Sequence, residues 1–110
     1  MTNTYNKDDE NSEPQAFNVK GEIAQTIVPL IQGYRELMAS GDSYCIPNWV
    51  VDDGETLSEK EMASRWLDYL AIMIKAFEME IQGELITQQM RKEQDKGLAL
   101  FAKYYAHLWD

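Results

Sequence analysis

Apolar side chains recur every three or four residues in three stretches of the chain, a spacing that places them on one face of an α-helix. The first stretch covers residues 20–40, with apolar positions at Ile23, Ile27, Leu30, Ile31, Tyr34, Leu37 and Met38. Gly41 follows and favours a helix end, because glycine adopts positive φ at little cost. Pro29 removes one backbone N–H donor inside the pattern, so we expect one kinked helix. A helix that starts near Pro29, after an irregular turn, is the alternative.

The second stretch predicts a helix that begins near Ser58. The Ser58 hydroxyl can accept a hydrogen bond from the Glu61 amide while the Glu61 carboxylate accepts one from the Ser58 amide, which is a reciprocal capping box. Thr56 and Glu59 offer the same motif two residues earlier. The apolar positions that follow are Met62, Trp66, Leu70, Met73, Phe77 and Ile81, with Ala63, Leu67, Ile74 and Ala76 widening the face. Glu61 and Arg65 have the i,i+4 spacing of a favourable ion pair.

The third stretch lies near the C-terminus, with apolar positions at Ile86, Met90, Leu98, Phe101, Tyr104, Tyr105 and Leu108. Gln94 and Gly97 interrupt this apolar face, so the helix begins either near Leu85 or only near Asp95. We favour the longer helix, because residues 87–96 hold no proline and many good helix formers.

Two segments lack helical periodicity. Residues 1–18 are polar and acidic, with only Tyr5 and Phe17 as large apolar groups, and too little apolar area predicts a flexible tail. Residues 41–57 contain glycine and proline but also Tyr44, Trp49 and Val50, which predicts an apolar loop packed across the helices. The sequence therefore predicts an all-α fold in one helical domain over residues 19–110. It is a three-helix bundle with a kinked first helix, an apolar loop and a long helical hairpin.

Composition and charge exclude several classes of protein. With 110 residues and a net charge of −9, the chain is a poor ligand for the phosphates of nucleic acid, so direct nucleic-acid binding is not expected. A single cysteine, Cys45, excludes an internal disulfide framework and a cysteine-based zinc cluster. We find neither a signal peptide nor an apolar stretch long enough to span a membrane, and we expect a cytoplasmic protein without a membrane partner.

The residues that carry chemistry are sparse. His107 is the only histidine, so a histidine-based triad or a histidine-rich metal site is excluded, and a pairing of Cys45 with His107 is less favoured than a packed cysteine. Glu80 and Glu84 have i,i+4 spacing, yet no second helix offers a matching acidic motif for magnesium. We therefore expect no catalytic residues, no metal and no cofactor. A small divalent-metal or nucleotide-binding helical domain is one alternative.

The aromatic residues are the more informative set: Trp49, Trp66, Trp109, Tyr44, Tyr69, Tyr104 and Tyr105 exceed what a three-helix core of this length readily buries. Trp66 is in phase with the core. The predicted partner-binding residues are Tyr44 and Trp49 in the loop and Trp109 and Asp110 at the C-terminus, because tryptophan and tyrosine carry much of the energy of protein interfaces. A loop that folds down and covers Trp49 and Trp109 is the alternative.

Two motifs in the C-terminal half resemble those of small helical proteins encoded by bacteriophages and prophages. They are Trp66-x3-Leu70-x2-Met73-Ile74-x-Ala76-Phe77-Glu78 and Gly97-Leu98-x-Leu100-Phe101-x-Lys103-Tyr104-Tyr105-x2-Leu108-Trp109-Asp110. The first helix with its internal proline is similar too, and the resemblance covers roughly residues 20–110. It implies a phage origin, hence host cytoplasm, and a helical fold. It lends no catalytic residue, because members of that group carry no assigned activity.

These observations predict a non-enzymatic interaction protein that binds itself as a homo-oligomer, a host protein, or both, through an aromatic surface. A second alternative is an acidic inhibitor or DNA mimic that acts on a host defence or nucleic-acid enzyme. Its weakness is the charge distribution, because residues 1–18 and 19–57 carry −3 and −4 whereas residues 58–110 carry only −2. A duplex mimic needs dense carboxylates on rigid helices.

Overall fold

The computed structural model describes residues 18–41, 45–82 and 87–108, and within these ranges it is all-helical. Three α-helices, α2 (Val19–Ser40), α3 (Glu59–Gln82) and α4 (Gln88–Tyr104), are accompanied by two short 3-10 helices, η1 (Asn48–Val50) and η2 (Tyr105–His107). No strand occurs in the described ranges. The predicted all-α bundle is confirmed. The tail predicted for residues 1–18 lies, but for Asn18, outside the described residues.

Helix α2 runs through Pro29 without interruption and ends at Gly41, whose φ of 81° is the left-handed conformation expected of a C-terminal glycine. The prediction of one helix that includes Pro29 is confirmed, the alternative start near Pro29 is wrong, and the predicted kink stays a prediction. The buried face differs from the predicted one, however. Gly21, Ala24, Val28 and Ile31 are buried, whereas Ile23 and Leu30 are exposed. Among the described helices, α3 is the one whose backbone packs against α2, so one edge of the apolar face of α2 stays open to solvent.

Helix α3 begins at Glu59, and the predicted capping box at its start is confirmed. The Ser58 amide donates to Glu61 Oε1 at 2.8 Å, and the Glu61 amide donates to Ser58 Oγ at 3.1 Å. The close ion pair of Arg65 is with Glu55, at 2.6 Å, and Arg65 acts on the predicted partner Glu61 only through a weaker Coulombic attraction. The Glu61 carboxylate is held by the amide of its own cap.

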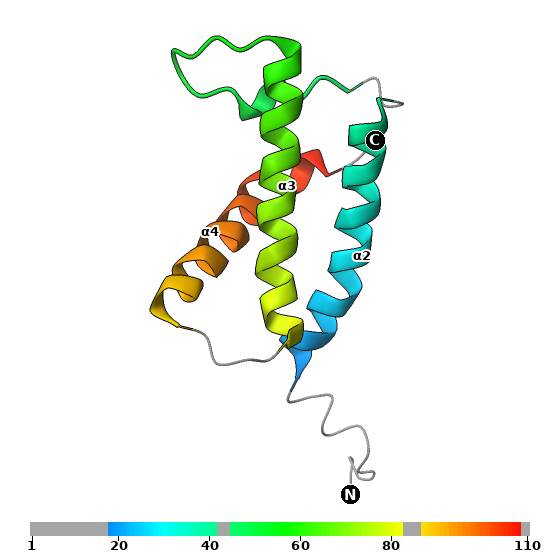
Figure 1. The fold of residues 1–110 in the computed structure, drawn as a ribbon, viewed down its shortest axis with the longest axis vertical. Coiled ribbons are helices and arrows are strands. Elements are labelled where there is room, and N and C mark those ends of the chain that lie inside the picture. The colour runs from blue at the N-terminus through cyan, green and yellow to red at the C-terminus, as the bar shows by residue number, and fades with distance from the viewer. Residues whose placement is uncertain (1–17, 42–44, 83–86, 109–110) are drawn as a thin grey trace, which may run out of the picture.

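Helix α3 lies between the other two and supplies most of the core (Figure 1). Its buried residues are Trp66, Leu70, Met73, Ile74, Ala76, Phe77 and Met79. Trp66 is confirmed as a core residue, while Ile81, predicted on the same face, is exposed. Both α2 and α4 pack against α3, but the backbones of α2 and α4 do not approach each other. The bundle is therefore open on the side where α2 and α4 face one another.

Helix α4 begins at Gln88, where Thr87 Oγ1 accepts a hydrogen bond from the Met90 amide at 3.1 Å. The longer of the two predicted helices is therefore the correct one, although its start is three residues later than the predicted Leu85, which lies outside the described ranges. Of its predicted apolar positions, Tyr104 is buried, whereas Leu98 and Tyr105 are exposed.

Gln94 and Gly97, predicted to interrupt the apolar face of α4, are buried against α3. A Cβ atom added at Gly97 would lie 2.5 Å from the Ala76 Cβ and 2.7 Å from the Ile72 carbonyl oxygen. The buried Gln94 side chain donates to the Ala76 carbonyl oxygen at 3.3 Å and to Glu80 Oε1 at 3.4 Å. The absent side chain of Gly97 thus allows the two helices to approach closely, and Gln94 satisfies polar groups beside that crossing.

Candidate functional site

The four residues predicted to bind a partner have different positions in the structure. Tyr44, Trp109 and Asp110 lie outside the described residues. Trp49 belongs to η1 and is half-buried, with its ring 5.3 Å from that of Trp66 in an edge-to-face contact. The Trp49 ring also stacks on the His107 ring, with 4.4 Å between centroids and 7° between planes. Trp49 therefore joins the loop, α3 and the C-terminal segment.

Trp49 is part of an aromatic cluster inside the bundle, which also contains Tyr34, Trp66, Tyr69, Tyr104 and His107. The Trp66 indole N–H donates to Tyr34 Oη at 3.3 Å, and the Tyr34 hydroxyl donates to the His107 carbonyl oxygen at 3.0 Å. The buried Trp49 Nε1 has no hydrogen-bond partner among the described residues. Much of the aromatic surplus noted in the sequence is thus used in packing, and of the described aromatics Tyr105 is the strongly exposed one.

Arg65 fixes the loop that carries Trp49. Its guanidinium donates to both carboxylate oxygens of Glu55, at 2.6 and 2.8 Å, and to the Val50 carbonyl oxygen at 3.2 Å. These hydrogen bonds from Arg65, with a further one from the Asp52 amide, lower the pKa of Glu55 to about 2. Val50 is fully buried, which confirms the predicted packing of the apolar loop over its described part.

An apolar groove separates α2 from the C-terminal part of the chain. It encloses about 330 Å³ and is lined by Ile27, Leu30, Ile31, Tyr34, Phe101, Tyr105 and Leu108, a set that we call the α2–α4 trough. Its α2 wall continues by one turn to Ile23 and its α4 wall by one turn to Leu98, where a second cleft also contains Lys20, Glu80 and Arg91. The periodicity puts Leu30, Leu98 and Tyr105 on the apolar faces of two helices, but it does not show that these faces leave a groove between them.

Four large apolar side chains of this groove and its adjoining cleft are strongly exposed, and Val19 at 54% lies one turn before Ile23 on the same edge of α2. The four are Ile23 at 48%, Leu30 at 68%, Leu98 at 40% and Tyr105 at 67%. Isolated apolar residues on a surface are normal, but a contiguous patch marks a contact surface. The signal that could have located it is the uncharged run from Ile23 to Tyr34, which is unusual in a chain with 26% charged residues.

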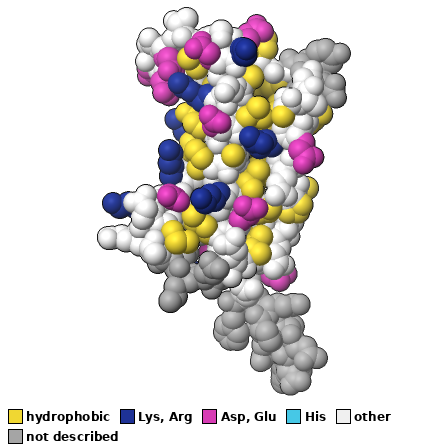
Figure 2. Space-filling model, viewed as in Figure 1, with side chains coloured by type: hydrophobic (Ala, Val, Ile, Leu, Met, Phe, Trp, Pro, Cys, Tyr) yellow, Lys and Arg dark blue, Asp and Glu magenta, His cyan; other side chains and the backbone are white. Residues whose placement is uncertain are grey.

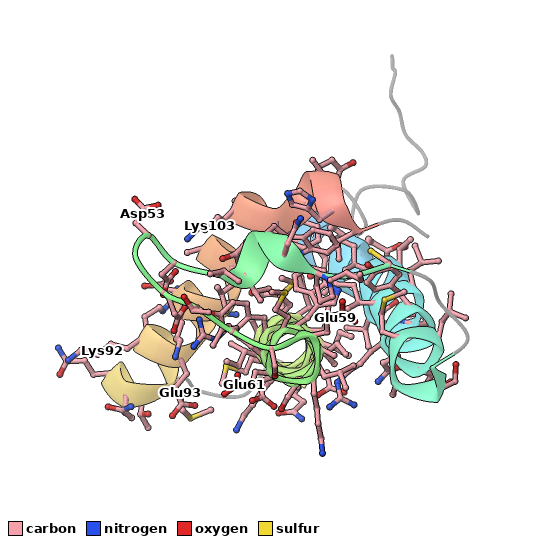
Figure 3. The ribbon with its side chains drawn as sticks, turned by 90° about the horizontal axis from the view of Figure 1, so that it is seen from above. Asp53, Glu59, Glu61, Lys92, Glu93 and Lys103 are labelled. Carbon is pink, nitrogen blue, oxygen red and sulfur yellow. The ribbon has the colours of Figure 1, made fainter. Side chains whose placement is uncertain are left out.

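No charged side chain lines the trough itself, and Lys20, Glu80 and Arg91 line the adjoining cleft. Acidic residues gather over the loop between η1 and α3, and lysines and arginines follow α4 (Figure 2). Lys92, Glu93 and Lys103 extend from α4 on the side away from α2, and Asp53 extends outward from the loop (Figure 3). The α2–α4 trough therefore combines exposed apolar side chains with a lining that carries no charge.

The described residues contain no group of three histidine, cysteine, aspartate or glutamate side chains placed to hold a metal ion. Of the predicted carboxylate pair, Glu84 lies outside the described ranges. Glu80 contacts Lys20 at 3.4 Å and accepts from Gln94. Within the same ranges, none of the helices has a stretch long and apolar enough to cross a bilayer.

Comparisons with known proteins identify no relative: no protein-family model, curated protein or solved structure matches the chain.

Proposed function

We propose that this protein is a non-enzymatic interaction protein that receives an apolar helix of a partner in the α2–α4 trough. The observation that carries the proposal is the trough itself, an open apolar groove between two helices that do not cover each other. Grooves of this kind bind amphipathic helices through apolar residues spaced by three, four or seven positions.

The composition of the trough supports this function. The centres of protein interfaces are depleted in charged residues and enriched in aromatic ones. The trough contributes Tyr34, Phe101 and Tyr105 and has no charged lining residue. Tyr105 is the best candidate for an anchor, because it is two-thirds exposed and a tyrosine can add both apolar area and a hydrogen bond.

The partner class also follows from the resemblance noted in the sequence. A small helical protein of a phage would meet both copies of itself and proteins of its host, so both remain candidate partners. We place the binding surface in the trough instead of the loop, because the Trp49 ring packs on Trp66 and His107.

Site-specific photocrosslinking tests the proposal. Benzoylphenylalanine placed at Leu30 of the full chain, in the cells that produce it, should give discrete adducts on irradiation. The same group at Gln25, an exposed position on the opposite side of α2, should give none of them. A second change, Leu98→Glu, should abolish the adducts formed from position 30. Identical adducts from both positions, or none from position 30, would refute the proposed function.

A further inference from the structure

The edge of α2 that borders the trough resembles the kind of helix that the trough would bind. Val19, Ile23 and Leu30 are exposed and separated by four and seven residues, so they form one apolar line along α2. Ile23 and Leu30 stand on one wall of the groove and its adjoining cleft, with Val19 one turn beyond Ile23, and Leu98 and Tyr105 stand on the other wall. The chain thus has both an apolar groove and, on α2, an apolar helix edge of the kind that such a groove binds.

We propose that the occupant of the trough is a second copy of this chain, with the α2 edge of each protomer inserted between α2 and α4 of its partner. This inference rests on the proposed function and names the partner. In a two-fold dimer the same surface patch is used on both protomers. Each α2 edge would therefore insert into the partner's trough and also form one wall of its own.

The absence of charged residues from the trough lining favours a second copy of the chain over a strongly charged partner. The chain carries −9, so two copies repel each other wherever their acidic surfaces meet. Residues 23–34 of α2 contain no charged side chain, and the trough lining contains none. Docking residues 23–34 of α2 into the trough therefore brings two uncharged surfaces together. Within the trough a basic or acidic partner helix would find no complementary charge. The charged side chains of Lys20, Glu80 and Arg91 line the adjoining cleft next to Ile23 and Leu98.

The exposed area is close to what a stable dimer requires. A fully exposed aliphatic side chain presents roughly 100 Å² and a tyrosine roughly 200 Å², so the five exposed side chains together present about 350 Å². A standard interface buries about 800 Å² per partner, of which about 450 Å² is apolar. The half-buried Ile27, Phe101 and Leu108 in the trough supply part of the difference.

Sedimentation equilibrium of the full chain tests the inference. The wild type should approach twice the 12.7 kDa chain mass over a series that reaches about 1 mM. Leu30→Glu should weaken dimerisation by about 100-fold or more, because both copies of Leu30 lose their apolar contact. The control Gln25→Glu adds the same charge on the far side of α2 and should leave the dimer intact. Leu98→Glu, on the opposite wall, provides a second disruptive variant, and circular dichroism should show wild-type helicity in all three.

Each outcome decides between the two proposals. A wild-type chain that stays monomeric, or a dimer that neither Leu30→Glu nor Leu98→Glu weakens, would overturn the second copy as occupant. The proposed function would survive that result if benzoylphenylalanine at position 30 still gave a discrete adduct with a different protein. A monomeric chain without such an adduct would overturn both.

Discussion

Helices α3 and α4 approach each other closely at Gly97, so we expect Gly97→Ala to destabilise the fold. The same substitution at Gly33, an open position on α2, should stabilise it. Gly97→Ala places a Cβ atom 2.5 Å from the Ala76 Cβ and 2.7 Å from the Ile72 carbonyl oxygen. The second contact is with a backbone atom, which cannot rotate away as a side chain can. We therefore expect the steric clash to cost about 3 kcal/mol, near the top of the range for added methyl groups in a packed site. Replacing a helical glycine by alanine returns about 1 kcal/mol. The free energy of unfolding should therefore fall by about 2 kcal/mol.

Gly33→Ala is the matched control, because Gly33 also lies inside a helix but nothing stands within 4 Å of its added Cβ. This variant should gain the helix-propensity term alone, about 0.5–1 kcal/mol. Urea denaturation followed by circular dichroism measures both changes. The Leu30→Glu background removes any contribution from self-association, which would make stability depend on concentration.

The expected difference between the two variants is about 3 kcal/mol, and the melting temperature of Gly97→Ala should fall by roughly 10 °C. If Gly97→Ala is as stable as the parent, or is stabilised like Gly33→Ala, then α4 does not cross α3 at this glycine. The position of the α4 wall of the trough would then be wrong as well.

Two further predictions concern the loop and the aromatic cluster. Glu55 has a pKa of about 2 in the folded chain and 4.5 as its ordinary value, so its pairing with Arg65 stabilises the fold above pH 4.5 and is lost as pH falls toward 2. The difference in urea midpoint between wild type and Glu55→Gln should therefore shrink over that range, and a constant difference would contradict the pairing. Tyr34→Phe removes the acceptor of the Trp66 indole N–H and the donor to His107, and should cost about 1–3 kcal/mol in thermal or urea unfolding. An unchanged midpoint would show that this hydrogen-bonded chain does not form.

Local signals in the sequence were sufficient for the helices. The Ser58–Glu61 capping box, the Gly41 helix end and the buried Trp66 all depend on residues within a few positions of one another, and all three are found in the structure. The unbroken path of α2 through Pro29 was also predictable, because the apolar face keeps its phase on both sides of the proline.

Features that depend on the neighbours of a helix were not predictable in the same way. Periodicity indicates which face of α2 is apolar but not how many helices cover it, so it does not show that Leu30 is exposed. Gly97 was treated as a gap because the pattern counts apolar side chains, whereas helices approach most closely where a side chain is missing. Arg65 was paired with Glu61 on spacing, but the loop brings Glu55 closer.

The predicted binding residues illustrate the same limit. Trp49 was selected as a large aromatic residue in a loop, and the structure shows the loop turned so that its ring packs on Trp66 and His107. Tyr44, Trp109 and Asp110 remain predictions, because they lie outside the described residues. The trough combines residues more than 60 positions apart, Leu30 and Tyr105 among them, so it becomes visible only once the helices are placed.

An isotope-filtered NOE experiment tests most directly whether the α2–α4 trough receives a second copy. A sample that mixes labelled and unlabelled full-length chains reports only contacts between protomers. Cross-peaks should connect the Leu30 methyl groups of one protomer with the Phe101 or Tyr105 rings of its partner, and they should vanish in Leu98→Glu. The absence of such cross-peaks at concentrations where the chain is dimeric would show that the copies meet through a different surface.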